Sequence, residues 1–89
     1  MTLNWKQSDD WRVREARGAR AIGGTYRIHN YGEDGFFVDY RKARKPGWWS
    51  IGTVATEGEA IALAQANHDK KLVALIHGVA RPRGRRFVS

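Results

Sequence analysis

The sequence predicts an α+β fold: a meander of three to four antiparallel strands, packed on one face by a single C-terminal helix. Several short runs alternate apolar and polar residues with the period of half-buried strands, and turn residues separate them. The last run, 48–54, leads into an alanine-rich stretch with helical periodicity. Thr56 and Glu59 stand at this junction with the spacing of a capping box, which marks where the helix begins.

Alternation within the runs assigns the two faces of the sheet. Tyr26 and Ile28 share one face, which we expect to be the core, while the residues between them point outward. The turn between this run and the next contains Asp34-Gly35, a pair suited to a type I′ hairpin. The expected strands are 11–16, 25–31, 36–42 and 48–54, and the lead-in 1–8 has the alternative of forming a short edge strand; the other inward residues are Phe36, Val38, Tyr40, Trp49 and Ile51.

The helix is expected to start at Glu57, with the Thr56 hydroxyl bonded to the N–H of Glu59 and the Glu59 carboxylate reaching back to the N–H of Thr56. We expect it to continue to His77, with Gly78 as its stop; a break near Asp69 is the alternative. Residues 1–79 then form one domain, and 80–89 a basic tail that is disordered until bound. Residues at a spacing of three to four form the core-facing stripe: Ile61, Ala64, His68, Leu72, Leu75 and Val79.

Composition and charge exclude several classes of function and favour one kind of partner. The 89 residues include no cysteine, which excludes disulfides and thiolate metal sites, and no apolar run resembles a signal peptide or a membrane span. We therefore expect a cytoplasmic protein with no membrane partner. The formal charge is +7, distributed as +4 over residues 1–54, −1 over 55–79 and +4 over 80–89. Positive charge concentrated on the sheet and the tail favours a polyanionic partner.

The junction Ile51-Gly52-Thr53-Val54-Ala55-Thr56-Glu57-Gly58-Glu59-Ala60 resembles the strand-to-helix junction of plant ethylene-response-factor DNA-binding domains. It is also similar to the arm-binding domains of phage tyrosine recombinases. Both families read roughly Leu-Gly-Thr-Phe, a spacer and Thr-x-Glu-Glu-Ala; here Val54 replaces the aromatic residue and Gly58 the first Glu. The resemblance implies a three-stranded sheet that enters the DNA major groove, with Arg and Trp side chains of the strands in contact.

A second resemblance, in chain length and in the order of the expected elements, is to the small orphan proteins of phages, prophages and plasmids. These proteins often begin with a short Trp-containing strand and end with an alanine-rich helix. Some inhibit host defence, including anti-CRISPR proteins that dock on a nucleic-acid-bound complex. The likeness implies an alternative partner, an acidic or nucleic-acid-bound host protein complex.

The candidate binding residues are basic groups interleaved with aromatic rings, a combination that suits phosphate contacts and stacking. The leading hypothesis is a non-enzymatic nucleic-acid-binding module, with DNA favoured over RNA. The alternatives are an anti-CRISPR-like inhibitor that uses the same surface, and a protein–protein interaction module such as a homodimer paired through an edge strand. The candidates are Arg12, Arg14, Arg27, His29, Tyr31, Phe37, Arg41 and Trp48 on the exposed sheet face, Lys42, Arg44 and Lys45 in the 41–45 hairpin, and Arg81, Arg83, Arg85 and Arg86 in the tail.

No pattern in the sequence points to catalysis, a metal or a cofactor. His68 and His77 are nine residues apart, whereas a zinc pair on a helix uses a spacing of four. The serines lack a glycine-flanked elbow, and no Gly-x-Gly-x-x-Gly motif is present. We therefore expect a protein that is not an enzyme and holds no cofactor or metal.

Overall fold

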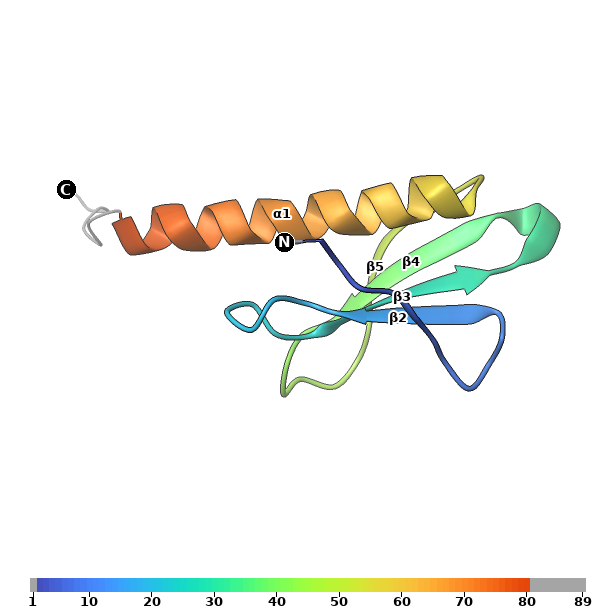
Figure 1. The fold of residues 1–89 in the computed structure, drawn as a ribbon, viewed down its shortest axis with the longest axis horizontal. Coiled ribbons are helices and arrows are strands. Elements are labelled where there is room, and N and C mark those ends of the chain that lie inside the picture. Colours follow the sequence, from blue (N-terminus) through green and yellow to red (C-terminus); the bar gives the residue numbers. More distant parts are fainter. Residues whose placement is uncertain (1, 81–89) are drawn as a thin grey trace.

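A computed structural model describes residues 2–80 of the chain, with side chains described for residues 2–75. All the strands are antiparallel and form one sheet in the order β1-β2-β3-β4-β5. One helix follows them, so the predicted α+β meander with a single C-terminal helix is confirmed (Figure 1). The elements are β1 (Lys6–Gln7), β2 (Val13–Arg17), β3 (Thr25–Asn30), the 3-10 turn η1 (Gly32–Asp34), β4 (Phe36–Arg41), β5 (Trp49–Val54) and α1 (Glu57–Ala80).

The sheet has five strands, so the expected three to four was too low. The additional strand is the lead-in, where Lys6 pairs with Glu15 and Gln7 with Arg14. The turn before β4 also differs from the expected two-residue type I′ hairpin. Its connection spans 31–35, and positive φ occurs at Gly32 and Gly35 and not at Asp34.

The helix is continuous, without the alternative break near Asp69. The expected stop at Gly78 is wrong, because the backbone stays helical to Ala80; glycine permits a left-handed cap but does not impose one. The predicted tail lies outside the described residues from position 81 onward. Within the part of the chain that the structure describes, no helix is sufficiently long and apolar to cross a lipid bilayer.

The core lies between the sheet and α1, which packs against β3, β4 and β5 (Figure 1). Ala60 and Ala64 are fully buried, and their small side chains let the helix backbone come close to the sheet. The rings of Tyr26 and Tyr40 fill the sheet side of the core, with centroids 4.6 Å apart. The Tyr26 hydroxyl donates a hydrogen bond of 2.6 Å to Asn67 Oδ1 of α1. The other buried apolar residues are Leu3, Ala16, Ile28 and Val38.

The start of α1 is fixed by the Thr56 hydroxyl, which accepts a hydrogen bond of 3.1 Å from the Glu59 N–H, as the capping box predicts. The second half of the expected box has a different geometry. The Glu59 carboxylate accepts from the Thr56 hydroxyl, at 3.0 Å, in place of the Thr56 backbone N–H. These two hydrogen bonds therefore connect the loop 55–56 to the first turn of the helix.

An irregularity in β5 changes which of its side chains face the core. The register shifts between Val38 and Asp39, so that Ser50 pairs with Asp39 and Gly52 with Val38, leaving Ile51 as the extra residue of a β-bulge. Ile51 packs against the core as expected. Trp49 pairs with Tyr40 and so shares the face covered by α1, but it lies on the outermost strand with 61% of its surface exposed, so its predicted place in the core is wrong.

The C-terminal part of α1 projects beyond the sheet (Figure 1). The predicted core stripe holds as far as Ala64 and His68, which are buried. Leu75 is 41% exposed and so departs from the stripe, because the sheet no longer lies beneath it.

The buried tyrosines make stability sensitive to alkaline pH. Burial raises the pKa of Tyr26 and the pKa of Tyr40 above the ordinary value of 10.0. Below that value both the folded and the unfolded chain carry neutral tyrosines, and the full stability is present. Above it the unfolded chain ionises first, so the free energy of unfolding falls as pH rises, by up to about 1.4 kcal/mol per pH unit for each tyrosine.

We expect urea unfolding of the wild type between about pH 9 and pH 11 to show this fall. The Tyr26→Phe variant is the matched control. It should be less stable at neutral pH, because Asn67 loses its partner, yet its stability should decline less steeply with pH. Equal slopes for the two proteins would contradict the assignment to Tyr26.

Candidate nucleic-acid interface

The sheet has one face against α1 and a second face turned away from it, here called the open face. Cross-strand pairs place Glu15, Arg27, Asp39 and Ser50 in one row across the open face, since paired residues share a face. A neighbouring row holds Val13, His29, Phe37 and Thr53, and a third holds Arg17, Thr25 and Arg41.

Arg14 was predicted on the exposed sheet face, and the structure corrects this. It pairs with Ile28, on the face covered by α1, and its Nε lies 3.1 Å from Glu57 Oε2 at the start of the helix. Arg12 precedes β2, in the turn, where its Nε lies 3.5 Å from Asp10 Oδ1. Both arginines therefore already have a carboxylate partner, away from the centre of the open face.

The centre of the open face is occupied by a buried ion cluster. Asp39 is only 4% exposed, and its carboxylate accepts hydrogen bonds from Arg27 at 3.2 and 3.4 Å. The ring of His29 lies 3.3 Å from the same carboxylate. The Arg27 guanidinium stacks over Trp48, 3.5 Å from the ring centroid, and Arg41 lies 5.2 Å from that centroid. Two predicted contact residues, Arg27 and His29, are thus bonded within the protein.

The remaining aromatic candidates form a small stack beside this cluster. His29 lies 5.9 Å from Tyr31 and 5.7 Å from Phe37, measured between ring centroids. Tyr31 keeps 55% of its surface exposed at the margin of the sheet. The stack leaves Tyr31 as the candidate ring of this group that is most open to a partner.

One end of the sheet carries a hollow rich in positive charge. The connection 18–24 between β2 and β3 and the connection 42–48 between β4 and β5 lie at the same end of the meander (Figure 1). Between them is an open hollow of about 680 Å³ whose lining includes six cationic side chains and no acidic one. We call this the cationic hollow, and its cations are Arg17, Arg20, Arg41, Lys42, Arg44 and Lys45.

Four of these cations, Arg41 to Lys45, were predicted as the 41–45 hairpin, whereas Arg17 and Arg20 were missed. Their spacing in the sequence carries no motif. The signal was topological, because alternate connections of a meander emerge at the same end of the sheet.

Packing and hydrogen bonds hold the two connections together. A Cβ on Gly23 would lie 2.9 Å from the Cβ of Ala43, so glycine is needed where the connections touch. The Tyr40 hydroxyl donates to the Gly23 carbonyl at 3.3 Å. From α1, the buried Nε2 of His68 accepts a hydrogen bond of 2.9 Å from the Ala19 N–H, which fixes the first connection to the helix.

Arg44 has the backbone conformation that glycine usually adopts. Its φ is +62°, and no other non-glycine residue in the described range has a positive φ. Such a conformation costs on the order of 1 kcal/mol for a residue with a Cβ. The chain keeps an arginine there, on the wall of the cationic hollow, although Gly47 in the same connection supplies a left-handed residue without that cost.

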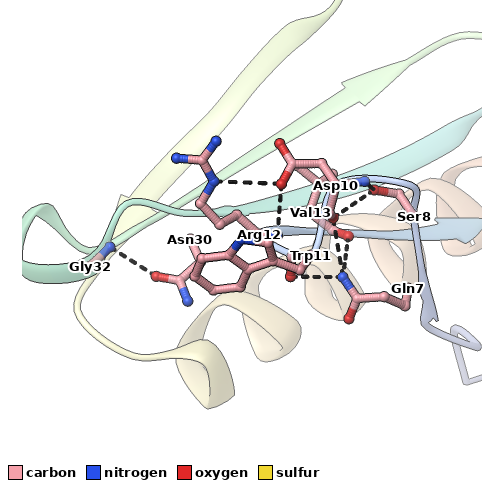
Figure 2. A network of polar contacts seen from close by, with 8 residues as sticks. All are labelled: Gln7, Ser8, Asp10, Trp11, Arg12, Val13, Asn30 and Gly32. Carbon is pink, nitrogen blue, oxygen red and sulfur yellow. Dashed lines mark hydrogen bonds and ion pairs between the residues drawn. The ribbon is translucent and has the colours of Figure 1, made fainter.

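The opposite end of the sheet carries two exposed aromatic rings, those of Trp11 and Tyr31, on turns that side-chain hydrogen bonds hold in place. Figure 2 shows Gln7 Nε2 donating to the carbonyls of Asp10, Trp11 and Val13, at 2.7 to 3.1 Å. The Trp11 ring is 73% exposed. The Asn30 side chain accepts from the Gly32 N–H at 2.8 Å and so orders the neighbouring connection (Figure 2).

Among residues 2–75, whose side chains the structure describes, no three His, Asp or Glu are grouped closely enough to hold a metal ion. No protein-family model matches the chain, and no curated protein sequence or solved structure matches it at a significant level. The four predicted tail residues, Arg81, Arg83, Arg85 and Arg86, lie outside the described residues.

The buried carboxylate of Asp39 should be a structural requirement. We expect Asp39→Asn to lower the free energy of unfolding by about 1–3 kcal/mol, because Arg27 loses its charged partner in a half-buried site. Asp34→Asn, at an exposed position, is the matched control and should change stability by less than about 0.5 kcal/mol. Urea unfolding measures both; equal effects would show that the Asp39 cluster contributes little.

Proposed function

We propose that this protein is a non-enzymatic nucleic-acid-binding module that holds a phosphate backbone, preferably of double-stranded DNA, in the cationic hollow. The supporting observation is the hollow itself: six cationic side chains, from two connections and from the ends of β2 and β4, converge on one concave surface without an acidic residue among them. Lysine and arginine side chains arranged in this way neutralise phosphates and release the counterions of the nucleic acid.

The state of these cations favours contact with a ligand over a purely structural role. All six are exposed, and none makes an ion pair among the described residues. Arg27, by contrast, is bonded to Asp39 and stacked on Trp48. Under this proposal the loop cations contact the ligand, while Arg27 and His29 maintain the sheet.

This division of roles makes the proposed binding largely independent of sequence. Base reading needs donors and acceptors free to meet base edges, and phosphate contacts carry no sequence information directly. The proposal therefore departs from the major-groove reading implied by the ethylene-response-factor resemblance. The tail arginines remain in the proposal as additional phosphate contacts.

The direct test is a fluorescence anisotropy titration of the full chain against a duplex of mixed sequence and a scrambled version. We expect similar affinities for the two and a steep loss of affinity with salt. The triple variant Arg20→Ala/Lys42→Ala/Lys45→Ala should weaken binding at least about tenfold at low salt and reduce the salt slope by about 2–3.

The control variant is Arg12→Ala/Lys70→Ala, which removes two exposed cations elsewhere and should retain nearly full binding. Absence of duplex binding by the wild type at low salt would contradict the proposed function. It would favour the anti-CRISPR-like inhibitor, in which the same hollow receives an acidic protein surface.

Arg44 gives a second prediction, in which stability and binding change in opposite directions. Arg44→Gly relieves the left-handed conformation and should raise the free energy of unfolding by up to about 1 kcal/mol. It should also weaken duplex binding by about threefold to tenfold, through loss of one phosphate contact. Arg44→Lys keeps the charge and should bind nearly as well as the wild type. An Arg44→Gly variant that binds with unchanged affinity would exclude Arg44 from the interface.

A further inference from the structure

Charge is separated along the length of the sheet. At the end opposite the cationic hollow lie the turn 8–12, the connection 31–35 and the first turn of α1 (Figure 1). These segments carry six carboxylates and one arginine, whereas the hollow has six cations. We call this opposite end the acidic end, and its carboxylates are Asp9, Asp10, Glu33, Asp34, Glu57 and Glu59.

Three of the six carboxylates at the acidic end bond to other groups of the protein, and the other three form no ion pair among the described residues. Asp10 pairs with Arg12, Glu57 pairs with Arg14, and Glu59 bonds to the Thr56 hydroxyl. The other three carboxylates, those of Asp9, Glu33 and Asp34, are on exposed residues and form no ion pair within the described part of the chain. Asp34, one of these three, lines a depression that also offers apolar contact.

That apolar contact comes from Trp11 and Tyr31, which are 73% and 55% exposed. Both rings line an open depression of about 450 Å³ that also includes Arg12 and Asp34. The backbone that carries Trp11 is fixed by the Gln7 amide (Figure 2), so displaying the ring to a partner costs little further ordering. Exposed Trp and Tyr rings on ordered backbone are typical anchors of protein interfaces.

We propose that the cationic hollow receives the acidic end of a second copy of this chain, in a head-to-tail contact. Charge complementarity selects this occupant: two hollows facing each other would repel, as would two acidic ends, whereas one of each attracts. Because the two surfaces differ, the contact is heterologous, and it extends into short chains or a ring where a twofold contact would stop at a dimer.

The same geometry sets the properties of the contact. Its charges are exposed, so the attraction weakens over the Debye length, about 10 Å at 0.1 M salt, and assembly is favoured at low ionic strength. Phosphates and carboxylates would compete for the same six cations, so a polyanion should dissociate the assembly into monomers. The inference needs only the charges at the two ends and does not depend on whether the physiological polyanion is DNA.

The test is a charge exchange in the full chain, followed by analytical ultracentrifugation at about 50 mM salt. One variant, Glu33→Lys/Asp34→Lys, reverses the acidic end and keeps the hollow. The other, Arg44→Glu/Lys45→Glu, reverses part of the hollow and keeps the acidic end. All four positions are exposed, and circular dichroism verifies that each variant is folded.

We expect the average mass of the wild type to rise with concentration and to return to that of the monomer at about 0.5 M salt or on addition of inorganic polyphosphate. Each variant alone should remain monomeric, and an equimolar mixture should associate, because each supplies the surface that the other lacks.

The proposal would be overturned by a wild type that is monomeric at low salt and high concentration, or by a variant that associates on its own as the wild type does. Association of the wild type without recovery in the mixture would also contradict it, because the contact would then not join these two ends. A failure of duplex binding is measured separately by anisotropy and would leave this outcome unaffected.

Discussion

The close approach of α1 to the sheet is the constraint on which the rest of the structure depends. Ala60 and Ala64 bring the helix backbone down onto the Tyr26 and Tyr40 rings, and these rings connect the core to the surface through their hydroxyls. One hydroxyl bonds to α1 through Asn67; the other bonds to the connection that forms one wall of the cationic hollow. The apolar core therefore helps to position one wall of the cationic hollow.

Positive charge has two different roles on this molecule. At the centre of the open face, Arg27 and the ring of His29 lie around a nearly buried carboxylate, where a missing partner is costly. At the end of the sheet, six exposed cations form no ion pair among the described residues, so they have little desolvation to offset and respond to the ionic environment. Net charge alone does not distinguish these roles, since burial and the neighbouring acid decide between them.

The sequence predicted the features that depend on local pattern. Alternation placed Tyr26, Ile28 and Val38 in the core, and the capping residues located the start of the helix. It did not predict features that arise between segments. Trp49 pairs with the core residue Tyr40 but lies on the edge strand, where it stays exposed, and Arg14 was assigned to the wrong face of the sheet. Arg17 and Arg20 join the hollow because the meander brings two distant connections together, and this is not visible in either segment alone.

The bulge at Ile51 also affects how the sheet meets its surroundings. β5 is the last strand of the sheet, and such an edge exposes backbone donors and acceptors to any extended chain nearby. An extra residue disturbs the regular spacing of those groups and increases the local twist, so a second strand cannot continue the hydrogen-bond ladder along the whole edge. The same bulge keeps Trp49 paired with Tyr40, so that an exposed aromatic ring also stands at this edge of the sheet.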